Sequence, residues 1–142
     1  MKIKLMITSF LLASSFAAFA TGPEYEKGKG LTHAVSCTPP TSRAPNAEGV
    51  QLPLTNDELD YGTVYLYEGG DLFTQGTLLD TQQTNIFCNW DLPVDNYPSG
   101  QMHLFATVTD TEARTSEVSI QGAPFYSFVI LMPPNAPIMT TQ

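Results

Sequence analysis

Two cysteines, Cys37 and Cys88, are the side chains of this sequence with the most distinctive chemistry. In an oxidising compartment an even number of cysteines favours a disulfide, and the leader described below indicates export to such a compartment. The alternative is that both are small buried hydrophobic residues. Neither cysteine has a second cysteine or a histidine at the spacing of a zinc site, so we expect no bound metal at either.

Carboxylates gather at two predicted turns. Asp57, Glu58 and Asp60 precede a tyrosine-rich stretch, and Asp110 and Glu112 follow a clearly alternating stretch. Three carboxylates so close together could hold Ca²⁺, but the twelve-residue calcium-loop pattern is missing. We favour solvated turns and leave a bound cation at the first cluster as the alternative. A glycosidase would need two carboxylates facing each other across a cleft, for which a domain this small has little room.

The residues of common catalytic sites do not form a recognisable set. His33 and His103 both lie on predicted strands, where a structural role is the simpler interpretation. Ser99 and Gly100 lack the flanking residues of a nucleophile elbow, and no phosphate loop or dinucleotide fingerprint occurs. We therefore expect no catalytic residues, no cofactor and no enzyme activity.

Aromatic side chains are the better candidates for binding. Tyr65, Tyr67 and Phe105 are predicted to share one face of a sheet, with Tyr65 and Phe105 as cross-strand neighbours. Such a patch would suit a sugar or a protein surface, although the rings could equally stabilise the sheet itself. If the face is structural, the loops at residues 42–56 and 110–123 are the next candidates for a partner site.

Length and charge limit the function classes. The chain has 142 residues and a formal net charge of −8, and loss of Lys2 and Lys4 with the leader would make it more negative. This length suits one domain. Nucleic-acid binding requires the opposite sign of charge, and anionic lipid surfaces repel such a chain.

The first twenty residues are typical of a cleavable secretion signal. Lys2 and Lys4 are followed by an apolar stretch ending in Ala18-Phe19-Ala20, which predicts cleavage before Thr21. The alternative is an N-terminal membrane anchor. No later apolar run is long enough to cross a bilayer, so we expect a periplasmic or secreted protein with no membrane span after cleavage.

The remainder of the chain predicts short strands separated by turns, because prolines and glycines recur every few residues between β-branched and aromatic runs. The clearest strand covers residues 101–109, where apolar and polar side chains alternate. The other predicted strands cover residues 31–38, 50–54, 62–68, 72–79, 84–92 and 125–132. The predicted class is an all-β sandwich of about seven strands.

Two stretches resemble the fibronectin type III family in its bacterial exported form. They are VSCTPPTSRAPNAEGVQLPLTNDELDYGTVYLYEGG and, from Gly100 to Thr111, GQMHLFATVTDT. The resemblance covers residues 31–132 and implies an immunoglobulin-like sandwich that serves as a non-catalytic module.

Three residues depart from the pattern of that family. Cys37 stands where the core tryptophan usually lies, Gly62 where the third strand has a tyrosine, and Met102 where the sixth strand has one. A Cys37–Cys88 bridge, with Trp90 adding volume, would replace the lost tryptophan packing.

The predicted organisation is a signal peptide (residues 1–20), a flexible arm (21–30), a fibronectin type III-like domain (31–132) and a C-terminal tail (133–142). The predicted function is an exported interaction or scaffold module. The alternative is a carbohydrate-binding module that uses the aromatic sheet face. A protein or a glycan is the expected partner, and nucleic acid is excluded.

Overall fold

A computed structural model describes residues 22–70, 75–117 and 126–140, and the predicted leader with its cleavage site lies outside them. Two short 3-10 helices, η1 (Asn56–Glu58) and η2 (Val94–Asn96), accompany the strands. The strands are β1 (Glu24–Glu26), β2 (Thr32–Val35), β3 (Leu59–Gly70), β4 (Gln75–Thr84), β5 (Trp90–Pro93), β6 (Gly100–Asp110) and β7 (Tyr126–Leu131).

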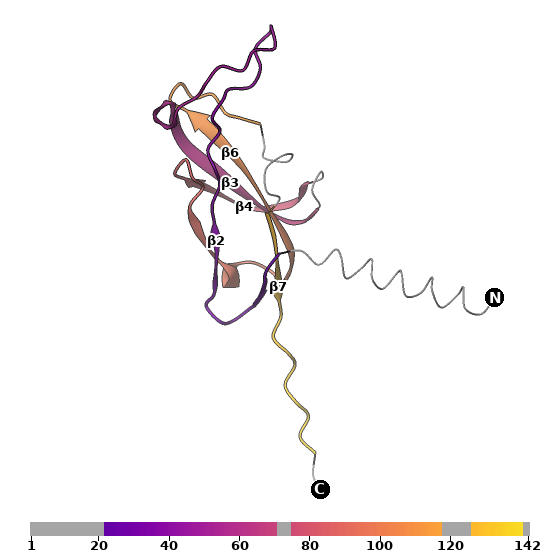
Figure 1. The fold of residues 1–142 in the computed structure, drawn as a ribbon. Helices are drawn as coiled ribbons and strands as arrows, with labels where there is room; N and C mark the ends of the chain where they lie inside the picture. Colours follow the sequence, from indigo (N-terminus) through magenta and orange to yellow (C-terminus); the bar gives the residue numbers. More distant parts are fainter. Residues whose placement is uncertain (1–21, 71–74, 118–125, 141–142) are drawn as a thin grey trace, which may run out of the picture.

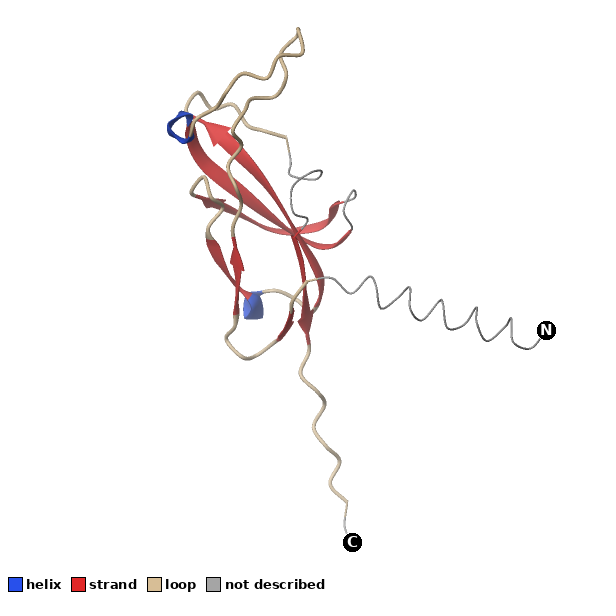
Figure 2. Cartoon of the chain, in the orientation of Figure 1, coloured by secondary structure: helices blue, strands red, loops and turns tan. Residues whose placement is uncertain are grey.

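The strands form two sheets, as Figures 1 and 2 show. The larger sheet has the order β1-β7-β6-β3-β4, and the smaller pairs β2 with β5. All pairs are antiparallel except β1 with β7, which run in parallel. The all-β prediction is confirmed for the described residues. None of those residues belongs to a helix long and apolar enough to cross a membrane.

The core lies between the two sheets, because alternate residues of each strand face it. Val64 and Leu66 of β3 and Met102 of β6 are almost fully buried there. Val35 of β2 and Leu92 of β5 meet them from the smaller sheet. Since side chains of a strand point to opposite faces in turn, the alternation seen in the sequence fixes this inward face.

The segment predicted as a flexible arm instead contains strand β1, which corrects that prediction for residues 22–30. Tyr25 packs against the core, and the backbone N–H of Lys27 donates to the carbonyl of Leu131 at 2.8 Å. The Asp95 carboxylate accepts hydrogen bonds from the N–H groups of Gly28 and Gly30, at 2.7 and 3.0 Å. The arm was mispredicted because its pairing partner, β7, lies at the other end of the sequence.

The single strand predicted over residues 84–92 is wrong, since β4 extends to Thr84 and a turn follows. The Asn85 side chain accepts the backbone N–H groups of Phe87 and Asn89, at 3.0 and 3.2 Å, as asparagine does in turns. Cys88 has a φ of 57°, in the left-handed region. These bonds close the turn, which lies beside Gly62 of β3.

Gly62 is required where this turn meets the sheet. Its N–H donates to the carbonyl of Asn85 at 3.1 Å. A Cβ atom added at Gly62 would lie 2.7 Å from that same carbonyl oxygen and 2.9 Å from Oγ1 of Thr84. Glycine is needed at this position because the backbone of β3 and the backbone of the turn approach too closely for a side chain to fit between them.

Residues 41–54 form a protrusion that we call the finger, which projects from one end of the molecule (Figure 1). Its two sides are joined by the N–H of Arg43 donating to Leu52 O at 2.8 Å and that of Leu54 donating to Thr41 O at 3.0 Å. The Asn46 side chain closes the tip by accepting two backbone N–H groups. The finger includes the short extended piece predicted at residues 50–54.

Candidate binding site

The two cysteines form a disulfide, which confirms the predicted bridge. Cys37 follows β2 and Cys88 precedes β5, so the bridge joins neighbouring strands of the smaller sheet, with 5.2 Å between the Cα atoms. The N–H of Cys37 also donates to the carbonyl of Phe87 at 2.7 Å. The bridge therefore fixes the chain that leaves β2 toward the finger.

An apolar groove of about 930 Å³ lies beside the disulfide and reaches the base of the finger. It forms because β2 ends at Val35 while β3 and β6 continue toward the finger. The inner face of β3 and β6 thus supplies the floor, and the chain after β2 supplies one wall. Representative lining residues are Val64, Leu104, Ala106, Pro40, Ala44 and Ile86.

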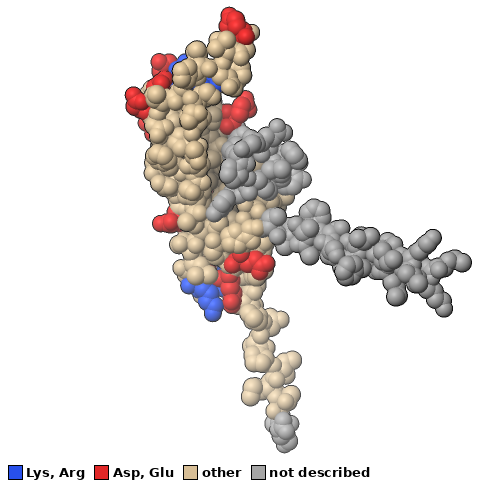
Figure 3. All heavy atoms as spheres, viewed as in Figure 1, with Lys and Arg blue, Asp and Glu red and all other residues tan. Residues whose placement is uncertain are grey.

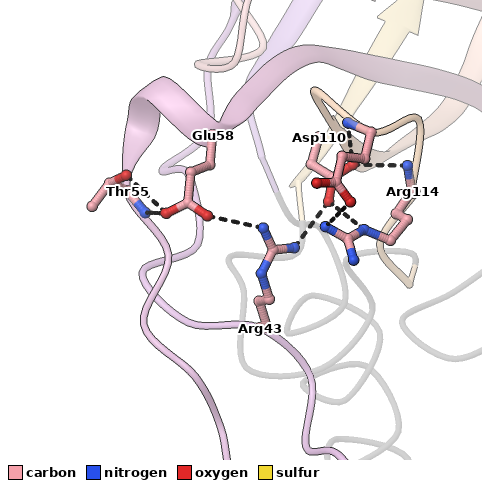
Figure 4. A network of polar contacts seen from close by, with 6 residues as sticks. Arg43, Thr55, Glu58, Asp110 and Arg114 are labelled. Carbon is pink, nitrogen blue, oxygen red and sulfur yellow. Dashed lines mark hydrogen bonds and ion pairs between the residues drawn. The ribbon is translucent and has the colours of Figure 1, made fainter.

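A network of ion pairs fastens the finger at the end of this groove (Figure 4). Arg43 pairs with Asp110 at 2.9 Å and with Glu58 at 3.0 Å. Arg114 pairs with the same Asp110 at 2.8 Å and with Glu112 at 2.9 Å. The network joins the finger to η1 and to the end of β6, so it sets where the finger stands relative to the groove.

Asp110 is the centre of the network. Its side chain is 5% exposed, and it accepts the backbone N–H groups of Glu112 and Arg114 at 3.0 and 2.9 Å. The bond from the Arg114 backbone is the largest influence holding the pKa of Asp110 well below its usual range, and the guanidinium groups of Arg43 and Arg114 add to it. A carboxylate held ionised in this way serves to hold the loop together and is unsuited to exchanging protons near neutral pH.

The acidic cluster before β3 has its own internal partners. The Glu58 carboxylate accepts the backbone N–H and the hydroxyl of Thr55, at 3.2 and 3.0 Å. Hydrogen bonds from Thr55, followed by Arg43, lower the pKa of Glu58. Within the part of the chain that the structure describes, no group of three or more His, Cys, Asp or Glu side chains is arranged to hold a metal ion. The arrangement of Glu58 is that of a closed turn.

The predicted aromatic face is assembled as expected, although it is less accessible than an exposed patch. Tyr65 lies opposite Phe105 in the β3–β6 register, and Tyr67 meets Phe105 edge to face at 5.5 Å between ring centroids. Phe105 is only 1% exposed. The placement of the three rings is confirmed, and their role in binding stays a prediction.

Both histidines are buried in structural positions. His33 stacks on Phe128 at 4.3 Å between ring centroids, and its Nδ1 lies 2.6 Å from the Tyr25 hydroxyl. Burial lowers the pKa of His33 to about 4. Nδ1 of His103 lies 2.6 Å from the carbonyl oxygen of Gly69. His33 therefore joins β1, β2 and β7 as a neutral ring.

The sequence interpretation missed the groove and the part played by Arg43. Arg43 and Asp110 are 67 positions apart, and neither belongs to a recognisable motif. The one useful signal was the assignment of residues 42–56 and 110–123 as the loops to examine after the aromatic face. Residues of the finger and of the turn after β6 do line the groove.

No family model, curated protein or solved structure matches this chain. The resemblance to fibronectin type III modules therefore rests on the sequence pattern alone.

Proposed function

We propose that this chain is an exported, non-catalytic interaction module with a fibronectin type III-like sandwich fold. The strand order supports the fold. In immunoglobulin-like sandwiches the sixth and seventh strands pair beside the third, and the second strand pairs with the fifth in the opposite sheet. The orders β7-β6-β3 and β2-β5 agree with that arrangement, whereas β1 pairs with β7 and β4 extends the sheet beside β3. The disulfide supports an oxidising compartment, periplasmic or extracellular.

The apolar groove is the observation that carries the binding role. Its volume of about 930 Å³ lies within the range of about 300–1,000 Å³ usual for ligand sites. The floor is aliphatic and the rim carries the paired charges of Arg43, Asp110 and Arg114. An apolar centre with a polar rim is the composition of a protein-binding surface.

A protein segment fits the groove better than a sugar does. Sugars stack on exposed aromatic rings, whereas the accessible apolar lining of the groove is mostly aliphatic, as at Ile86, Ala106 and Val108, and Phe105 is the one ring among the described residues that line it. The rings of the aromatic face include Phe105, which is 1% exposed. We therefore place the partner in the groove and assign the aromatic face to sheet stability.

The proposal is tested by peptide selection. A random twelve-residue peptide library on phage is panned against the mature protein, and enriched peptides are measured against two variants. Ala44→Trp places a ring at the mouth of the groove from an exposed position. Thr81→Trp makes the same kind of change at an exposed position of β4 and serves as the control.

We expect enriched peptides to bind the wild type and Thr81→Trp equally and to lose at least tenfold in affinity for Ala44→Trp. No enrichment, or equal binding to all three proteins, would overturn the proposal. A glycan array provides the remaining comparison. Binding of a glycan that Tyr65→Ala abolishes, with Ala44→Trp unaffected, would assign the function to the aromatic face.

A further inference from the structure

We propose that the groove receives the segment of residues 132–140 from a second copy of this chain, so that copies associate head to tail. The inference rests on the proposed function, because it names the occupant of the same groove. Two residues of the segment, Ile138 and Met139, are 90% and 88% exposed. Side chains of this kind are normally covered, and a contiguous exposed pair marks a contact surface.

In the structure the segment points away from the groove of its own chain. It continues from β7, which runs antiparallel to β6 and pairs Ile130 with Gly100. The groove lies toward the other end of β6, at Ala106 and Asp110. The segment therefore leaves the molecule at the end opposite the finger, as Figure 1 shows, and points away from it.

The composition of the segment suits insertion into an apolar groove. Residues 132–140 contain no charged side chain. Pro133, Pro134 and Pro137 restrict the backbone to extended conformations, so less conformational entropy is lost when the segment docks. At about 3.1 Å per residue an extended proline-rich segment of seven residues spans about 20 Å, which carries Ile138 well clear of its own domain.

Charges of both signs lie at the end from which the segment leaves. Lys27 and Lys29 lie there, since the Lys27 N–H is bonded to Leu131 O, together with Glu24 and Glu26 of β1, and Figure 3 shows basic and acidic atoms close together there. At the groove end Arg43 and Arg114 are already engaged in ion pairs. The proposed contact therefore depends on apolar burial and not on an attraction between oppositely charged ends.

Such a contact joins different surfaces of the two copies and does not close on itself, so it generates chains of copies and not a fixed dimer. Sedimentation velocity of the mature protein over a range of concentrations measures this directly. We expect the average mass to rise with concentration past that of two chains. Raising the salt to about 1 M, where screening acts within about 3 Å, should leave the association intact, because it reduces the repulsion between the negatively charged copies.

Three comparisons identify the contact. Ile138→Asp should keep the protein monomeric, whereas Leu78→Asp, at a half-exposed residue of β4, should associate as the wild type does. Ala44→Trp should also be monomeric. A synthetic peptide of residues 132–142 should disperse the wild-type assemblies. Circular dichroism melting of each variant verifies that it is folded.

A wild-type protein that stays monomeric at millimolar concentration overturns the head-to-tail proposal, as does association that Ile138→Asp and the peptide leave unchanged. If the selected phage peptides still bind the groove in that case, the proposed function stands and only its occupant is wrong. If neither the selected peptides nor the 132–142 peptide bind, both proposals fail.

Discussion

Buried His33 should make this protein lose stability as the pH falls from 7 to 5. Its ring is 1% exposed and stacks on Phe128. Burial lowers its pKa to about 4, against about 6.5 in an unfolded chain. Between these values the unfolded chain binds a proton that the folded chain excludes. Stability therefore falls as the pH falls through this range and is fully retained only above about pH 6.5.

The size of the loss follows from the two pKa values. A shift of one pKa unit corresponds to about 1.4 kcal/mol, so the full loss reaches about 3 kcal/mol near pH 4. At pH 5 about 2 kcal/mol is already lost, which lowers the melting temperature of a domain of this size by about 6–10 °C. Among the described residues, the carboxyl groups with lowered pKa values are those of Asp57, Glu58, Asp95 and Asp110. They affect stability only at lower pH, because their unfolded pKa values are 3.8–4.5.

Urea unfolding at pH 7, 6 and 5 measures this loss, with His33→Gln as the matched variant. Glutamine keeps an oxygen that can accept from the Tyr25 hydroxyl, and it does not titrate. We expect the variant to be less stable at pH 7 because it loses the stacked ring, and to change little between pH 7 and 5. Wild type and variant curves that fall in parallel would refute the assignment of this pH dependence to His33.

Three other perturbations test the packing described above. Reducing or removing the Cys37–Cys88 bridge, which closes a loop with a sequence separation of 51, should cost about 4 kcal/mol by the loop-closure relation; unchanged urea midpoints with and without reductant would contradict it. Gly62→Ala should destabilise the protein by about 1–3 kcal/mol, because its Cβ would lie 2.7 Å from a backbone oxygen. Thr63→Ala on the same strand is the control and should cost less. Equal urea midpoints for the two variants would show that the turn can move to accommodate the added methyl group. Phe105→Ala should cost about 3–5 kcal/mol as a buried ring, measured by thermal melting, and a change below about 1 kcal/mol would show that the ring is a surface feature.

The sequence predicted the elements whose patterns are strong and local. Strands β3 and β6 have clear two-residue alternation over long stretches, and both were placed to within a few residues. The disulfide followed from the cysteine count and the leader. The strand predicted over residues 84–92 was wrong, because the alternation of Ile86, Cys88 and Trp90 hid a turn that depends on the Asn85 side chain.

The features that depend on contacts between distant residues could not be predicted. Strand β1 exists because it pairs with β7, and the arm that contains it has no β pattern of its own. The groove results from the different lengths of β2 and β6, and the ion pair of Arg43 with Asp110 joins two loops far apart in the sequence. The sequence shows a glycine at position 62 where a tyrosine is usual. The reason that no side chain fits there, the close approach of the Asn85 carbonyl, is visible only in the structure.

The central claim is that a protein segment binds in the apolar groove, and nuclear magnetic resonance measures its location most directly. The mature protein, with labelled methyl groups, is titrated with a peptide enriched from the phage library. The account predicts that the methyl signals of Ile86, Ala106 and Val108, which line the groove and are partly exposed, shift while that of Leu78, on the exposed edge strand β4, stays in place. Shifts confined to residues next to Tyr65 and Tyr67, or no shift in the groove at saturating peptide, would contradict it.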